Sequence, residues 1–168
     1  MELTKKERLA LIYQLKILEA LYPDERSDYA LKRTALENGY ELHYDWLFED
    51  ISAGLTADRC KEILDVLDMY RAITFGLQRL EPDHPLQSED LAKFRGFDGN
   101  NEGHLMAYVR YFIMDLERYQ ELKPGKFPTF NSHTPMLSTY REMLRRWNPI
   151  PNKYELSEQD IASVIGAN

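Results

Sequence analysis

The sequence predicts an all-α protein, a multihelical single domain over residues 1–168 with sub-lobes possible at residues 1–80 and 86–168. Apolar residues recur at three- and four-residue spacing along most of the chain, which is the period of an amphipathic helix. Capping residues stand where several of these runs begin. No segment alternates apolar and polar residues as a half-buried strand would. Together these patterns indicate about seven helices.

Capping residues delimit the first two helices. Thr4 and Glu7 form a capping box, in which each side chain satisfies a free backbone donor, and it predicts a helix ending near Tyr22. A second helix is expected over residues 26–38. It should end at Gly39, because glycine adopts the left-handed backbone of a helix C-terminus at little cost.

Four further segments lie in the middle of the chain. Residues 40–51, rich in Tyr and Trp, predict a shorter third helix, and Thr56 predicts the cap of the longest helix, over residues 57–80. Prolines interrupt the chain before a short helix expected over residues 86–94. The turn-forming residues that follow lead into a helix over residues 102–120.

Two helices complete the predicted fold. Thr134 is expected to cap a helix with Pro135 in its first turn, running to about Trp147. Ser157 and Asp160 then start a last short helix.

Two of the predicted helices, over residues 57–80 and 105–119, are apolar around most of their circumference. Such a helix must be buried on several sides. Each is therefore either a central core helix or a helix packed against another subunit, and both interpretations can hold together.

Composition excludes several classes of protein. With 168 residues and a formal net charge of −7, the chain lacks the excess of positive charge expected of a nucleic-acid binder. Its single cysteine, Cys60, cannot form an intrachain disulfide or a cysteine-rich zinc site. No signal peptide or membrane-length apolar run is found, so the cytoplasm is the expected location. The phosphate-binding, nucleophile and zinc-protease motifs of common enzyme families are also absent.

The loop over residues 96–104 is the first polar candidate site. Asp98, Asn100 and Glu102, followed by a glycine, match the opening of a calcium loop, but Val109 stands where that loop needs a bidentate Glu. We therefore expect no metal ion. The polar residues either cap the next helix or form a binding or catalytic site.

The loop over residues 127–135 is the second candidate. An Asn, a Ser and a His beside a helix N-terminus could bind an anion or orient a carbonyl, or could simply bond the loop backbone. If both loops meet at one pocket, Glu102 or a histidine would serve as the acid or base. The candidate ligand-binding residues are then Asp98, Asn100, Glu102, His104, Arg110, Asn131 and His133.

Several stretches, in order along the chain, resemble the YfbU family of bacterial proteins. They include residues 37–40 (ENGY), 65–71 (DVLDMYR), 96–98 (GFD), 108–112 (YVRYF) and 130–136 (FNSHTPM). The resemblance covers nearly the whole chain. It implies a multihelical protein that tends to self-associate, and it supplies no catalytic residues because the family has no established biochemical activity.

Three functions are consistent with these patterns. The one we favour is a cytoplasmic, homo-oligomeric protein that binds other proteins in a regulatory role, with neither catalysis nor a cofactor. The alternative is a small-ligand-binding protein or enzyme that uses loops 96–104 and 127–135. A nucleic-acid-associated regulator would have to gather Arg141, Arg145 and Arg146 into a local patch against the acidic balance of the chain.

Overall fold

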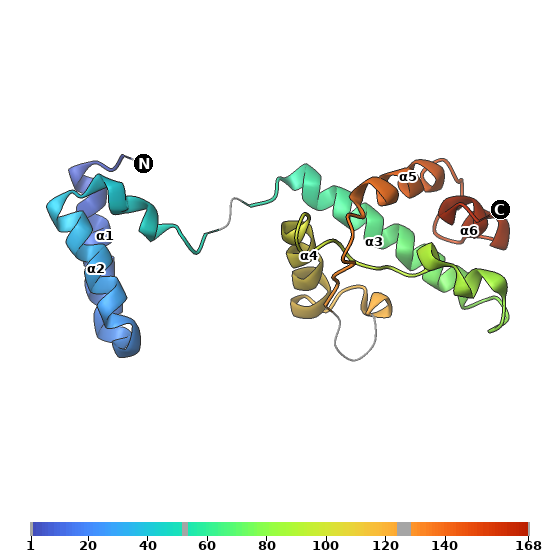
Figure 1. Ribbon diagram of the computed structural model, residues 1–168, viewed down its shortest axis with the longest axis horizontal. Helices are drawn as coiled ribbons and strands as arrows, with labels where there is room; N and C mark the ends of the chain where they lie inside the picture. Colours follow the sequence, from blue (N-terminus) through green and yellow to red (C-terminus); the bar gives the residue numbers. More distant parts are fainter. Residues whose placement is uncertain (1, 52–53, 124–128, 168) are drawn as a thin grey trace. The chain divides into compact units, whose positions relative to one another are not determined.

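The computed structural model describes residues 2–51, 54–123 and 129–167, and it confirms the all-α class (Figure 1). Over these ranges the only β-type pairing is an isolated bridge between Phe97 and Asn131. The chain divides into two compact units, Met1–Gly54 (unit 1) and Leu55–Asn168 (unit 2). This division precedes the longest helix, whereas the sequence suggested a boundary between residues 80 and 86.

Unit 1 is a helical hairpin followed by a tighter turn of helix. Its elements are α1 (Lys5–Leu21), η1 (Pro23–Glu25), α2 (Arg26–Asn38) and η2 (Glu41–Leu47). The capping box of Thr4 and Glu7 is present, and α2 ends at Gly39 with φ of 71°, both as predicted. The third helix expected over residues 40–51 is present but shorter and tighter than predicted, covering Glu41–Leu47. That segment is the 3-10 helix η2, the form that short connecting pieces commonly take.

The buried core of unit 1 is small. Leu15 of α1, Leu36 of α2 and Tyr44 of η2 form its centre. Arg8 strengthens the contact, because its Nη1 donates to the carbonyl oxygen of Leu36 at 3.1 Å. Unit 1 thus buries one face of α1 against α2 and η2.

Unit 2 is built around one central helix. Its α-helices are α3 (Ala57–Leu77), α4 (Gly103–Arg110), α5 (Leu137–Trp147) and α6 (Glu158–Ile165). Figure 1 shows α4, α5 and α6 arranged around α3, and all three contact it. Ile63, Val66, Tyr70 and Ile73 of α3 are fully buried. The long apolar helix is therefore a core helix, as the first of the two sequence interpretations holds.

The elements that follow α3 differ from the prediction. The long helix ends at Leu77 rather than at residue 80, and the Gln87 side chain donates to the Leu77 carbonyl oxygen at 2.9 Å. The helix expected over residues 86–94 is replaced by two 3-10 turns, η3 (Pro85–Ser88) and η4 (Asp90–Ala92).

The helix expected over residues 102–120 is also shorter. After α4 the chain widens into the π-helical turn η5 (Tyr111–Asp115), and the 3-10 turn η6 (Gln120–Leu122) follows. Between them the backbone is left-handed at Glu117 and Tyr119, with φ of 54° and 47°. This conformation interrupts an apolar pattern that periodicity alone reads as one helix.

The last two helices begin at different kinds of cap. Helix α5 starts at Leu137 with Met136 as its N-cap, so the predicted Thr134 cap and first-turn Pro135 are wrong. Helix α6 carries the predicted capping box of Ser157 and Asp160. No helix in the part of the chain that the structure describes is long and apolar enough to cross a membrane.

Candidate functional site

The two polar loops singled out by the sequence meet in space. The Phe97 amide donates to the Phe130 carbonyl oxygen at 2.9 Å, and the Ser132 amide donates to the Phe97 carbonyl oxygen at 3.1 Å. We call residues 96–104 and 129–136 the loop junction. Residues 127 and 128 of the second predicted loop lie outside the described residues.

Close backbone approach at the junction depends on Gly96. Its φ is +83°, and a β-carbon there would lie 2.0 Å from the Phe130 carbonyl oxygen. A side chain is therefore excluded by both conformation and space. The loops meet because the sequence supplies a glycine at this position.

The side chain of Asn131 fastens the two loops together. Its Oδ1 accepts from the Gly99 amide at 3.0 Å and from the His133 amide at 2.9 Å. The second bond is local to the turn and supports the left-handed backbone of His133, whose φ is 57°. The amide oxygen of Asn131 is thus engaged in holding the backbone.

Glu102 is the cap of a helix distant in the sequence. The residue is 8% exposed, and its carboxylate accepts from the backbone amides of Met136 and Leu137, each at 2.9 Å. It also accepts from the Asp98 amide at 3.1 Å. Amides in the first turn of a helix have no partner within that helix, and a carboxylate there also faces the positive end of the helix dipole. Glu102, rather than the predicted Thr134, therefore supplies the side-chain acceptor for the amides at the start of α5.

Asp98 is likewise used inside the loop junction. The residue is 2% exposed, and its carboxylate accepts from the Asn100 amide at 3.2 Å and from the side-chain amide of Asn101. The hydrogen bond from Asn101 is the main cause that lowers the pKa of Asp98, and the nearby His133 adds to it. The carboxylate is held ionised as the acceptor of a turn.

The other predicted site residues are exposed. Asn100 and His133 lie at the loop junction, and His104 lies in the first turn of α4. Arg110 ends α4, six residues beyond His104, a separation of about 9 Å along a helix. The junction thus gathers the candidates of the two loops and leaves Arg110 at the far end of the helix.

A hollow of about 440 Å³ lies against the second loop, lined by Phe94, Arg95 and residues 129–133. Arg95 and His133 supply its basic side chains, while Asp98 and Glu102 are engaged with the backbone. Among the described residues, no three His, Cys, Asp or Glu side chains are grouped so as to hold a metal ion. Binding of a ligand by the predicted residues remains a prediction.

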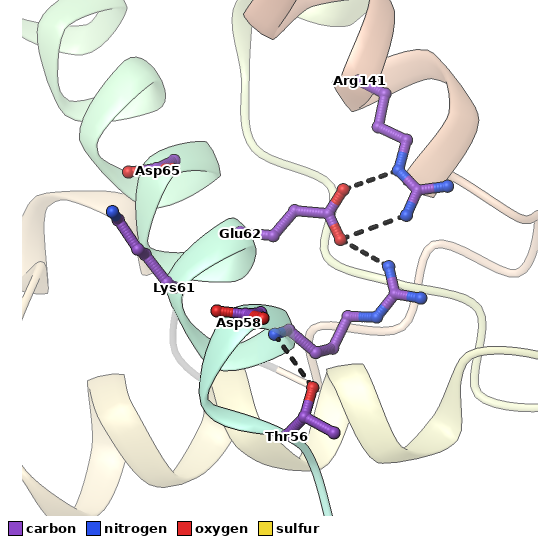
Figure 2. A pocket seen from close by; sticks show the side chains of 7 residues that line it. Thr56, Asp58, Lys61, Glu62, Asp65 and Arg141 are labelled. Carbon is purple, nitrogen blue, oxygen red and sulfur yellow. Dashed lines mark hydrogen bonds and ion pairs between the residues drawn. The ribbon is translucent and has the colours of Figure 1, made fainter.

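A larger hollow of about 520 Å³ lies beside the start of α3 (Figure 2). At its edge, Arg141 of α5 donates two hydrogen bonds, of 2.6 and 3.2 Å, to the carboxylate of Glu62 of α3. Arg59 also donates to this carboxylate. The bond from Arg141 is the main cause that lowers the pKa of Glu62. Asp58, Lys61 and Asp65 complete a lining in which both signs of charge alternate. This hollow has no dominant charge to select a ligand, and its ion pairs join α3 to α5.

Apolar side chains gather instead on the surface of unit 1. On α1, Leu9 is 50% exposed, Tyr13 and Ile17 are 58% exposed, and Leu21 is 65% exposed. With the exposed Ala10 and Ala20 they form what we call the α1 outer face. This face was not predicted from the sequence. The signal was present, because α1 carries apolar residues on both sides while belonging to a unit with a small core.

The rest of unit 1 continues this apolar character. Most of the large apolar side chains exposed in the described residues belong to this unit, although it is the smaller of the two. Besides those of the α1 outer face they are Tyr22, Leu31, Tyr40, Leu42, Trp46, Phe48 and Ile51. An excess of exposed large apolar side chains on one unit is typical of a protein-interaction surface.

Comparison with known proteins finds matches over nearly the whole chain. The model of the YfbU domain matches residues 1–167, and so spans both units. The UPF0304 protein MJECS11 of Methanocaldococcus jannaschii is 36% identical over 169 residues, covering 98% of this chain and 99% of that protein. That relative is archaeal, so the similarity is not restricted to bacterial proteins. The chain therefore belongs to the YfbU family.

Proposed function

We propose that this protein acts by binding protein chains, including further copies of itself, through the apolar surface of unit 1, and that it does so in the cytoplasm without catalysis. The α1 outer face is the observation that carries this proposal. A helix with apolar side chains on two faces gains stability when both faces are covered. Helix α2 and η2 cover one face of α1, which leaves the outer face available to a partner.

Residue types on unit 1 also support the proposal. Aromatic side chains are enriched at protein interfaces, and Tyr13, Trp46 and Phe48 are all exposed here. In unit 2, by contrast, the strongly apolar helix α3 is buried in the core. The buried carboxylates of the loop junction, Asp98 and Glu102, accept hydrogen bonds from backbone amides.

Light scattering of the full chain over a wide range of concentration tests this function. We expect a mass that is a fixed multiple of 19.8 kDa and persists on dilution. A mass of one chain at every concentration would contradict self-assembly.

One observation favours a second function, the binding of a small ligand at the loop junction. The two loops meet beside the 440 Å³ hollow, and His133 stands exposed on its rim. A panel of small anions and carbonyl compounds tests this alternative. It requires a ligand that raises the melting temperature of the wild-type chain and fails to do so for His133→Ala.

A further inference from the structure

The α1 outer face repeats at the spacing of a coiled-coil seam. Ala10, Tyr13, Ile17 and Ala20 follow one another at intervals of three, four and three residues. All four are exposed and lie on the side of α1 away from the buried Leu15. Side chains at this spacing form a continuous row on one side of a helix and can interdigitate with a second such row.

This row is symmetrical about the level of Leu15. Ala10 and Ala20 stand five residues to either side of it, and Tyr13 and Ile17 stand two to either side. When two such rows run in opposite directions, each small residue faces a small one and each large residue faces a large one. In a heptad repeat, Ala10 and Ile17 take position a, and Tyr13 and Ala20 take position d. Each a residue of one helix then faces a d residue of the other, which is the pairing that antiparallel helices make.

The flanks of the row share this symmetry. Leu9 and Leu21 are equally distant from Leu15, and so are Gln14 and Lys16. In an antiparallel pair, the exposed leucines of the two chains therefore stand at the same level.

Charge at the two ends of α1 favours the same direction. Lys5 and Lys6 are exposed at its start, whereas Asp24 and Glu25 are exposed in η1, directly after its end. An antiparallel partner brings the basic end of each chain to the acidic end of the other. A parallel partner would place like charges together, which is unfavourable.

We propose that unit 1 pairs with unit 1 of a second copy, α1 lying antiparallel to α1, about a two-fold axis level with Leu15. This inference rests on the proposed function and specifies its partner and contact. A two-fold interface uses the same surface on both chains, so that surface must be complementary to itself. The α1 outer face meets this requirement in size and in charge, whereas a different partner would impose no symmetry on α1.

Disulfide trapping in the full chain tests the direction of pairing. Two chains with different affinity tags carry Ala10→Cys and Ala20→Cys, each in a Cys60→Ser background. After mixing and mild oxidation, we expect the heterodimer to cross-link. Ala10→Cys chains alone should not, because their two sites would lie about 15 Å apart along the axis. Cross-linking of Ala10→Cys to itself, with none to Ala20→Cys, would overturn the proposal in favour of parallel pairing.

Substitutions at the two ends of α1 and in η1 provide an independent test by analytical ultracentrifugation. Lys6→Glu should raise the dimer dissociation constant about three- to tenfold, and adding Asp24→Lys should restore it. Leu21→Ser should weaken the dimer far more than Leu31→Ser, a matched control on α2 with 64% exposure against 65%. Circular dichroism would verify that each variant folds.

The outcomes separate the two proposals. A stable dimer that neither cross-links as expected nor responds to the Leu21 change overturns this pairing and leaves the proposed function intact. A chain that remains monomeric at all concentrations overturns both.

Discussion

At the scale of single residues, the carboxylate of Glu102 joins segments that are more than thirty positions apart. Glu102→Gln keeps its size and removes one oxygen acceptor and the charge that faces α5. Because a buried amide left without its partner is costly, we expect the free energy of unfolding to fall by about 1–3 kcal/mol. Urea denaturation measures this, with the exposed Glu81→Gln as control. Equal effects of both changes would show that the carboxylate does not cap the helix.

The lowered pKa of Glu62 predicts how the free energy of unfolding depends on pH. The arginines beside it hold its pKa below the ordinary value of 4.5, so its contribution is complete above pH 4.5 and is lost as the pH falls through the lowered value. Glu62→Gln should therefore destabilise the protein more at pH 7 than near pH 3. Urea midpoints at the two pH values test this, with the exposed Glu155→Gln as control. A deficit of the same size at both pH values would contradict the argument.

At the scale of elements, the geometry of the loop junction predicts that alanine has opposite effects on stability at two glycines. Gly96→Ala would force a β-carbon against the Phe130 carbonyl in a left-handed backbone, and we expect a loss of at least about 2 kcal/mol. Gly103→Ala, at the start of α4, meets open space and should be neutral or stabilising, by up to about 1 kcal/mol. Thermal unfolding of the pair measures both. Similar losses at the two positions would mean that the junction tolerates a side chain.

The same arrangement at a helix C-terminus occurs in both units. Helices α2 and α6 each end at a left-handed glycine, Gly39 and Gly166. In each case an arginine from the neighbouring helix donates to a carbonyl oxygen of the last turn, Arg8 to Leu36 and Arg146 to Val164, both at 3.1 Å. Arg146→Met should keep most of the apolar stem and lose this bond, lowering stability by about 1 kcal/mol. Arg145→Met, on an exposed side chain of the same helix, serves as control.

These elements also show what the sequence could predict. Local signals sufficed where a helix is set by neighbouring residues, as at the capping boxes of α1 and α6 and at Gly39. They failed where a residue distant in the sequence caps the helix, because Glu102 rather than Thr134 accepts from the first amides of α5. They failed again where the backbone departs from regular helix, since the apolar period continues through the π-turn η5.

The candidate site followed the same rule. The sequence identified two loops rich in polar residues, and the structure brings them together through the bridge between Phe97 and Asn131. It could not show that Asp98 and Glu102 point inward to backbone amides, since the same residue types serve a ligand site and a structural cap. The exposed apolar surface of unit 1 was missed for a related reason, because periodicity does not reveal how much of a helix its own unit can cover.

At the scale of the whole molecule, the two units differ in the size of their buried hydrophobic cores. Unit 2 has a large buried core around α3, and residues 55–168 produced alone should unfold in one cooperative transition. Residues 1–54 alone have a core centred on Leu15, Leu36 and Tyr44, and they should be largely unfolded at micromolar concentration, gaining helix as concentration rises. Circular dichroism over a dilution series tests both fragments. A stable, concentration-independent helical hairpin would show that unit 1 needs no partner.

The order of the units along the chain has a consequence for synthesis on the ribosome. Among the described residues, the core of unit 1 and the bond from Arg8 to Leu36 are made within that unit, so every residue of its hairpin is available as soon as it leaves the exit tunnel. Neighbouring ribosomes on one messenger hold many such nascent hairpins close together. The pairing proposed for α1 would then be available between growing chains before either has made α3, and assembly would begin during translation rather than after release.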